Sequence, residues 1–165
     1  MTRTRVDHAD WQFVTSRFSH LIAFGFGSGL VPRLPGTAGT VLALAIYLLL
    51  AHFLSQEVIL AITALTFILG AWAASDTEKS LTRADYGGIV IDEIVAFWLV
   101  LVFIPQSPWW FASAFVLFRL FDILKPWPIR FFDRHIPGGF GIMFDDLLAA
   151  SYTLLTIEIG VRTLL

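Results

Sequence analysis

Residues 57–75 read EVILAITALTFILGAWAAS, and this stretch decides the class of fold. Glu57, its first residue, is the only charged residue in it. A helix needs about 20 apolar residues to cross the hydrocarbon core of a bilayer, so this run has the required length and composition. The whole chain is similarly apolar, since 57% of its 165 residues are hydrophobic and its mean hydropathy is +0.76. Soluble domains are less apolar than this, so the sequence predicts an integral membrane protein.

Four further apolar runs lie on either side of this one. They cover residues 37–54, 89–104, 108–124 and 142–164. Together the five runs predict an all-α bundle of about five transmembrane helices. Ahead of them, residues 11–24 mix polar and apolar side chains and predict an amphipathic helix in the membrane interface. We therefore expect a single membrane domain over 1–165, with an amphipathic segment at 1–24 and a helical bundle at 25–165.

Lysine and arginine residues are restricted to alternate connections between these runs. They are Arg3, Arg5, Arg17 and Arg33 before the first run, Lys79 and Arg83 between the second and third, and Lys125, Arg130 and Arg134 between the fourth and fifth. The other two connections contain no lysine or arginine, and Arg162 lies alone near the far end. Because cytoplasmic loops are enriched in these residues, the pattern predicts a multi-pass protein with a cytoplasmic N-terminus.

Composition also excludes several classes of function. The chain has no cysteine, which excludes disulfides, thiolate metal ligands and a cysteine nucleophile. Its net charge is −2, and it has no long basic run, so we expect no nucleic-acid partner. The four histidines, at positions 8, 20, 52 and 135, do not have the spacing of metal ligands.

Five carboxylates are predicted to lie near the cytoplasmic ends of three spans. They are Asp92, Glu93, Asp122, Asp145 and Asp146. At 1.5 Å of rise per residue, all lie at a similar depth, ~5 Å inside the membrane boundary. An ionised carboxylate there is costly unless it is paired, hydrated or bound to a metal, so the group favours Mg²⁺, Mn²⁺ or Ca²⁺. The alternative for each acid is an ion-paired or snorkelling side chain. Asp76, Glu78 and Asp85 instead fall in a predicted polar loop, where solvated charge is expected.

Two cations flank one of these acids. Arg119 and Lys125 each lie three residues from Asp122, so the three side chains share one strip of a helix. Arg119 has two interpretations, as a phosphate ligand or as an internal ion-pair partner that makes Asp122 tolerable in lipid. Lys125 is predicted to contact phosphate, because the prolines at 126 and 128 end the helix there and stiffen the loop that presents it.

Residues 25–39, GFGSGLVPRLPGTAG, are too rich in glycine for a helix and predict a re-entrant or interfacial loop. The predicted phosphate-binding groups in it are Gly27, Ser28, Gly29 and Thr37. Glycine allows main-chain amides to approach an anion closely, and a hydroxyl at a helix start can add a further donor. A packing or hinge role is the alternative. Residues 138–141, GGFG, allow the same two interpretations.

Four segments resemble, in order and spacing, the motifs of the phosphatidylglycerophosphatase A family. They are GFGSGLVPRLPGTAG at 25–39, IVIDE at 89–93, FRLFDILKPWPIRFFD at 118–133 and GGFGIMFDD at 138–146. The resemblance extends over about 20 to 150, and Ala96 and Ala150 stand where glycine is expected. It implies Mg²⁺-dependent hydrolysis of phosphatidylglycerophosphate to phosphatidylglycerol and inorganic phosphate. Independently of the resemblance, the charge pattern puts these segments on the cytoplasmic side, so we expect a bacterial inner (cytoplasmic) membrane protein whose active site faces the cytoplasm. The polar site residues that it nominates are Ser28, Thr37, Asp92, Glu93, Arg119, Asp122, Lys125, Asp133, Asp145 and Asp146.

The resulting hypothesis is a metal-dependent lipid phosphatase. Its predicted catalytic residues are Asp92, Glu93, Asp122, Lys125, Asp145 and Asp146, and the five acids among them would hold one or two Mg²⁺ ions. Arg119, Lys125 and the amides of Gly27, Ser28 and Gly29 would stabilise charge on the phosphate oxygens. Water and a covalent phosphoenzyme both stay open as the route of attack.

Three alternative functions compete with this hypothesis, and the oligomeric state is a separate open point. A histidine-nucleophile phosphatase would need a histidine paired with arginine, and a CDP-alcohol phosphotransferase would need an aspartate motif that is absent from this chain. A divalent-cation transporter would distribute acids through the membrane depth, whereas here they lie near one face, apart from Glu158. A homodimer that buries polar faces is compatible with five short spans, as is a monomer.

Overall fold

The computed structural model of the protein describes residues 5–82 and 86–164, and its regular elements there are helices. In chain order they are α1 (Trp11–Thr15), α2 (Phe18–Ala23), the 3₁₀ helix η1 (Gly25–Leu30), α3 (Pro35–Phe53), α4 (Gln56–Glu78), α5 (Ile91–Phe103), α6 (Pro108–Leu124), α7 (Ile129–His135) and α8 (Gly138–Leu164). The all-α class is thereby confirmed. Arg3, Arg83 and Asp85, which the sequence placed in connections, lie outside the described residues.

A helix forms at each of the five apolar runs. Within the described part of the chain, three of these helices are long and apolar enough to cross a membrane, namely α3, α4 and α8. The other two are shorter, with 13 residues in α5 and 17 in α6. The helices therefore agree with a membrane protein, and the count of five spans stays a prediction.

The shortest of the five, α5, is the central helix of the bundle. It contacts α3, α4, α6 and α8. Val95, Phe97, Val100 and Leu101 on it are all fully buried. Because other helices surround α5, it presents little surface to the exterior and does not need the full length of a lipid-facing span. Its position also fixes the acids of its first turn in the middle of the bundle.

The outer helices carry large apolar side chains on their exposed faces. Leu49 on α3, Leu65 on α4, Val116 on α6 and Ile159 on α8 are each more than 60% exposed. Apolar surface of this extent is rare on soluble monomers, because its contact with water is unfavourable. Contact with lipid tails removes that cost, so the outer surface fits a bilayer.

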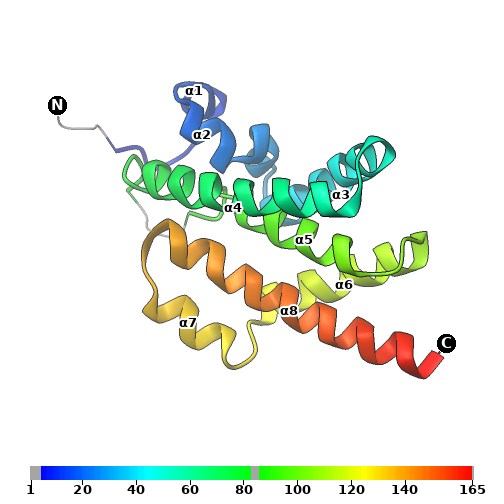
Figure 1. Ribbon diagram of the computed structural model, residues 1–165. Coiled ribbons are helices and arrows are strands. Elements are labelled where there is room, and N and C mark those ends of the chain that lie inside the picture. The colour runs from blue at the N-terminus through cyan, green and yellow to red at the C-terminus, as the bar shows by residue number, and fades with distance from the viewer. Residues whose placement is uncertain (1–4, 83–85, 165) are drawn as a thin grey trace.

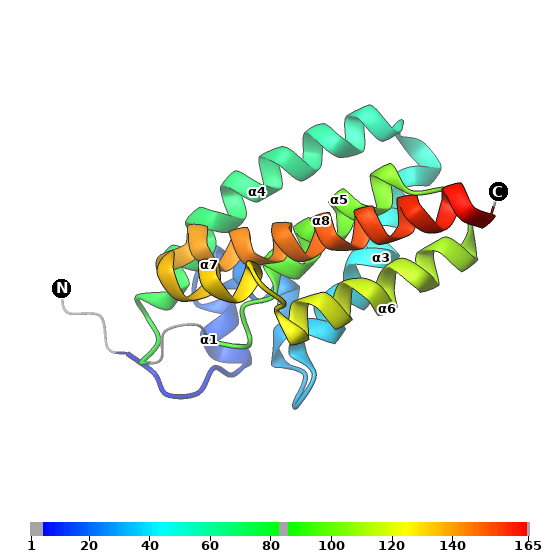
Figure 2. The same ribbon diagram turned by 90° about the horizontal axis from the view of Figure 1, so that it is seen from below.

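The long helices run side by side between two ends of the molecule (Figures 1 and 2). One end holds the α3–α4 and α5–α6 connections together with the C-terminus. The opposite end holds the N-terminus, α1, α2 and α7. The described connections that carry Lys or Arg lie at this second end. Which side of a membrane this end faces stays a prediction.

The N-terminal segment differs from the predicted single helix over 11–24. It forms two short helices, α1 and α2, because Arg17 between them has an extended backbone with φ −149° and ψ 148°. The Ser16 hydroxyl donates a hydrogen bond to the Phe13 carbonyl at 2.6 Å, an interaction that competes with helix continuation. Val14 and Ile22 are buried, since α2 packs on α4 and α1 packs on α2 and η1.

Two predictions about loops are wrong. Residues 25–39 contain helix, since η1 forms there and α3 begins at Pro35, a residue suited to the first turn of a helix. Left-handed backbone at Phe26 and Gly27, with φ 56° and 99°, interrupts η1, and glycine makes the second of these tolerable. Asp76 and Glu78 end α4 instead of lying in a polar loop, and Asp76 accepts a hydrogen bond from the Ser19 hydroxyl at 2.7 Å.

Candidate active site

A cavity of about 310 Å³ lies at the end of the molecule that holds α7. Its charged lining residues are Glu78, Asp92, Glu93, Asp122, Lys125, Asp133, Arg134, Asp145 and Asp146. All six residues that the sequence predicted to be catalytic are among them. They come from α5, α6, α8 and the connection after α6, so segments far apart in the sequence meet here.

Helix ends place these side chains. Asp92 and Glu93 lie in the first turn of α5, where free main-chain amides favour negative charge. Asp122 lies in the last turn of α6. Asp145 and Asp146 lie about two turns into α8 rather than one, because α8 begins at Gly138 and not at the predicted residue 142.

Glycine allows the early start of α8. A side chain at Gly139 would collide with main-chain atoms of Ala71 and Ser75 on α4. In its absence the two helices approach closely, and the Gly139 amide donates to the Ser75 hydroxyl at 3.0 Å. For residues 138–141 the packing interpretation therefore has direct structural support.

Three carboxylates form a cluster that fits a divalent cation. One oxygen from each of Asp92, Glu93 and Asp146 lies within 4.8 Å of the others. Each residue also has a buried oxygen with no hydrogen-bond partner among the described residues, namely Asp92 Oδ1, Glu93 Oε2 and Asp146 Oδ2. Buried oxygens without partners are costly, and carboxylate oxygens are the ligands that Mg²⁺ prefers. The donor set therefore fits this metal.

The other two acids are paired with cations. Arg119 Nη1 lies 2.7 Å from Asp122 Oδ2 and 3.3 Å from Glu93 Oε1. Lys125 Nζ contacts Asp145 Oδ2 and lies 2.6 Å from Asp133 Oδ1. Of the five predicted metal ligands, Asp92, Glu93 and Asp146 thus each have an unpartnered oxygen, while Asp122 and Asp145 are held by basic side chains, as is the other oxygen of Glu93.

Lys125 connects the two helices of the site. As the C-cap of α6 it has φ 42°, and its ammonium group turns back toward α7 and α8. Burial of this group lowers its pKa, but the hydrogen bonds to Asp133 and Asp145 outweigh burial and raise the pKa above its usual range. Lys125 therefore carries a stable positive charge at the wall of the cavity.

The six residues predicted to bind phosphate do not lie together in the structure. Among the described lining residues of the acidic cavity, only Lys125 belongs to that predicted set. Gly29 lines a separate cavity of about 360 Å³, and the Ser28 hydroxyl donates to the Gly25 carbonyl at 2.9 Å. Gly27 packs against the ring of Trp11, and Thr37 lies in the first turn of α3.

Arg119 is not among the described residues that line the acidic cavity. Its side chain is 14% exposed and pairs with Asp122 and Glu93, as the ion-pair interpretation predicted. A phosphate-binding role for it stays a prediction.

Gly36 is a site residue that sequence reasoning missed. A side chain at this position would collide with the Glu93 carboxylate and come within 2.9 Å of both terminal nitrogens of Arg119. Glycine therefore lets the start of α3 approach the Arg119–Glu93 pair. The glycine-rich composition of residues 25–39 was visible in the sequence, but nothing in it indicates this contact.

Comparisons with known proteins agree on one family. The family model described as phosphatidylglycerophosphatase A matches residues 21–161. A phosphatidylglycerophosphatase A of Haemophilus influenzae is 45% identical over 84% of this chain and 85% of its own length. One of Escherichia coli is 43% identical over 79% and 76%. A Bacteroides thetaiotaomicron protein provisionally named phosphatidylinositol-3-phosphatase is 40% identical over 85% and 91%. No solved structure matches.

Proposed function

Since this chain belongs to the phosphatidylglycerophosphatase A family and is thus a phosphatase, we propose that it hydrolyses phosphatidylglycerophosphate to phosphatidylglycerol and phosphate with Mg²⁺ as cofactor. One observation carries the proposal. Asp92, Glu93 and Asp146 bring carboxylate oxygens within 4.8 Å of one another in a cavity that Lys125 also lines, and each has a buried oxygen without a hydrogen-bond partner among the described residues. A phosphomonoester is strongly anionic, so a site for it must supply compensating positive charge.

The residues of the site have separable roles in this proposal. Asp92, Glu93 and Asp146 would hold Mg²⁺, which when bound neutralises phosphate charge and activates the attacking group. Lys125, held by Asp133 and Asp145, donates hydrogen bonds to phosphate oxygens. Arg119 positions Glu93 and Asp122 through its ion pairs.

The membrane arrangement suits a lipid substrate. The apolar exterior would contact the bilayer, and the acidic cavity lies near one end of the bundle, at the level expected for a lipid headgroup. The acyl chains could then stay in the hydrocarbon while the phosphate enters the cavity. The positive-inside rule supports an orientation with this end and the N-terminus in the cytoplasm. The apolar helices and the bacterial relatives support the inner membrane.

The test is phosphate release from phosphatidylglycerophosphate by purified protein in detergent micelles, with Mg²⁺ and with EDTA. We expect release only with Mg²⁺, and at least a 100-fold lower rate for Asp146→Asn, because a metal ligand is lost. Glu158→Gln is the control, since this exposed carboxylate pairs with Arg162 near the opposite end of α8. No release by folded wild-type protein would overturn the proposal and favour a cation transporter.

The Bacteroides relative makes phosphatidylinositol 3-phosphate the second candidate substrate. Like phosphatidylglycerophosphate, this lipid carries a phosphomonoester and a phosphodiester. The two are distinguished by kcat/KM measured for each in the same micelles. We expect the larger value for phosphatidylglycerophosphate, because the two relatives with higher identity carry that name.

A further inference from the structure

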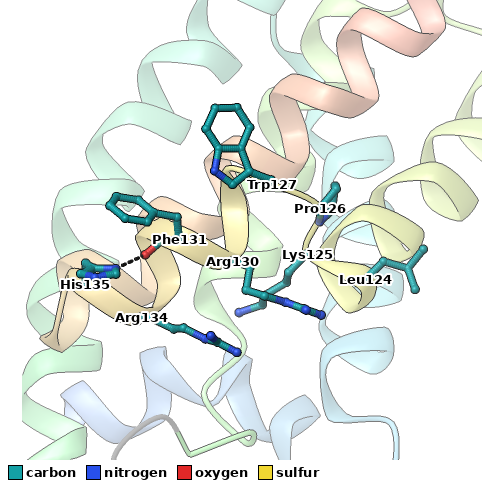
Figure 3. A pocket seen from close by; sticks show the side chains of 8 residues that line it. All are labelled: Leu124, Lys125, Pro126, Trp127, Arg130, Phe131, Arg134 and His135. Carbon is teal, nitrogen blue, oxygen red and sulfur yellow. Dashed lines mark hydrogen bonds between the residues drawn. The ribbon is translucent and has the colours of Figure 1, made fainter.

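A second cavity, of about 400 Å³, lies between the end of α6 and α7 (Figure 3). It is lined by Leu124, Lys125, Pro126, Trp127, Arg130, Phe131, Arg134 and His135. Lys125 and Arg134 line the acidic cavity as well. The two cavities are therefore neighbours, and one elongated molecule could occupy both.

The charged side chains of the second cavity are basic and its other lining residues are apolar or aromatic, whereas most charged side chains of the first cavity are acidic. Its described lining residues include no carboxylate. Arg130 and Arg134 are four residues apart on α7, so they share one face of the helix. Figure 3 shows both side chains on the same side of α7 as Lys125.

These two arginines are also unpaired. Within residues 5–82 and 86–164, neither side chain has an ion-pair or hydrogen-bond partner, whereas Arg17, Arg119 and Arg162 each pair with a carboxylate. Like charges at this spacing destabilise a helix slightly. A bound anion between Arg130 and Arg134 would remove that repulsion and supply their missing partner.

The opposite side of α7 is aromatic. Trp127 and Phe131 are 80% and 50% exposed, and they extend away from the basic side chains (Figure 3). Tryptophan and other amphipathic or aromatic residues concentrate where lipid headgroups meet the hydrocarbon. At the end of an apolar bundle this places α7 at the headgroup level, and the second cavity, which both rings and both arginines line, offers apolar surface and positive charge together.

We propose that Arg130 and Arg134 form a binding site for the phosphodiester of the lipid substrate, beside the site for its phosphomonoester. The proposal rests on the proposed function. In phosphatidylglycerophosphate one glycerol separates the two phosphates, and here two adjoining cavities of opposite character share Lys125 and Arg134. The acidic cavity takes the phosphate to be removed. The basic cavity takes the phosphate that remains in the product.

This arrangement gives the enzyme a means of choosing its substrate. Phosphatidate carries a phosphomonoester directly on diacylglycerol and has no phosphodiester. It would fill the first site and leave the arginines without a ligand. The preference for phosphatidylglycerophosphate over phosphatidate therefore depends on Arg130 and Arg134.

The test compares full-length wild-type protein with the double variant Arg130→Gln/Arg134→Gln on both lipids, in neutral detergent micelles with Mg²⁺. We expect about a tenfold rise in KM for phosphatidylglycerophosphate with kcat nearly retained, and an equal fall in the preference over phosphatidate. Arg162→Gln removes one arginine charge near the C-terminal end of α8 and should change neither constant. The double variant Arg130→Lys/Arg134→Lys keeps the charges without paired donors and should have an intermediate KM.

The outcomes separate this proposal from the proposed function. Wild-type protein that releases no phosphate from phosphatidylglycerophosphate contradicts the function itself. Active wild-type protein with an unchanged KM in the double variants overturns the α7 site alone. So does a rise in KM that appears only when other anionic lipid is added, because the arginines would then bind bulk lipid. If the glutamine variant does not fold, the lysine variant decides between these results.

Discussion

Individual carboxylates at the candidate site differ in their partners, and the difference predicts their effects. Asp92 has an unpartnered oxygen in the three-carboxylate cluster, whereas Asp133 is 29% exposed and binds Lys125. We expect Asp92→Asn to abolish Mg²⁺ binding and activity. Asp133→Asn should keep Mg²⁺ binding and lower activity roughly tenfold, since Lys125 retains Asp145.

Calorimetric titration with Mg²⁺, together with phosphate release, checks this division. The two variants remove the same charge by the same isosteric change, so each serves as the control for the other. Equal loss of Mg²⁺ affinity in both would show that the cluster extends to Asp133 and that our division of the acids is incorrect.

Gly36 offers a second test at the scale of one residue. Gly36→Ala would displace the Arg119–Glu93 pair, because the added methyl group collides with both side chains. We expect at least tenfold lower activity, measured as phosphate release. Gly160→Ala is the matched control, since a side chain there meets only Trp110, at an ordinary distance of 3.8 Å. Full activity of Gly36→Ala would mean that this pair can move without cost to catalysis.

Among the elements, α3 and α5 are joined at the end opposite the acids. The buried Tyr47 hydroxyl on α3 donates to the Leu101 carbonyl of α5 at 2.9 Å and lies 2.8 Å from Gln106 Oε1. Tyr47→Phe removes this hydroxyl donor, while the Leu101 carbonyl keeps the hydrogen bond from Gln106 Nε2 at 2.8 Å. We expect a loss of about 1 kcal/mol in the free energy of unfolding, with kcat unchanged.

Thermal unfolding in detergent and phosphate release on the same samples check this. The result separates stability from catalysis, because neither Tyr47 nor any other residue of α3 lines the acidic cavity. A large fall in kcat without a change in the unfolding temperature would contradict this prediction and indicate coupling between the two ends of the bundle.

The elements also show how far the sequence could predict the fold. Apolar runs located the five long helices to within a few residues, because burial in lipid or protein requires them. The short helix α7 was not predicted, since its seven residues are polar and aromatic and follow two prolines. The start of α8 was placed too late, because glycine is a poor helix former unless close packing requires it, as at Gly139.

For the whole molecule, the remaining question is how the two ends lie across the membrane. The chain has no cysteine, so single cysteines can be introduced for labelling without other changes. Lys79 and Thr163 are exposed, one after α4 and the other near the end of α8. With five spans and a cytoplasmic N-terminus, Lys79→Cys should react with an impermeant maleimide only after cells are permeabilised. Thr163→Cys should react in intact cells.

The two sites control for each other, because each reports on a different end of the bundle. Labelling of both on the same side of the membrane would contradict five spans and mean that one of the shorter helices, α5 or α6, does not cross. If instead Lys79→Cys reacted in intact cells and Thr163→Cys reacted only after permeabilisation, the cytoplasmic N-terminus would be contradicted, but five spans would still be possible.

Hydropathy and residue type are local properties, so the helical class, the positions of the long helices and the set of acids near one face can be predicted from the residues alone. Which acids share a cluster and which pair with cations depends on how the helices pack in three dimensions. Asp146 joins Asp92 although 54 positions separate them in the sequence, and its neighbour Asp145 turns to Lys125 instead. Side chains one residue apart on a helix point about 100° apart, so the packing of α5, α6 and α8 sets each partner.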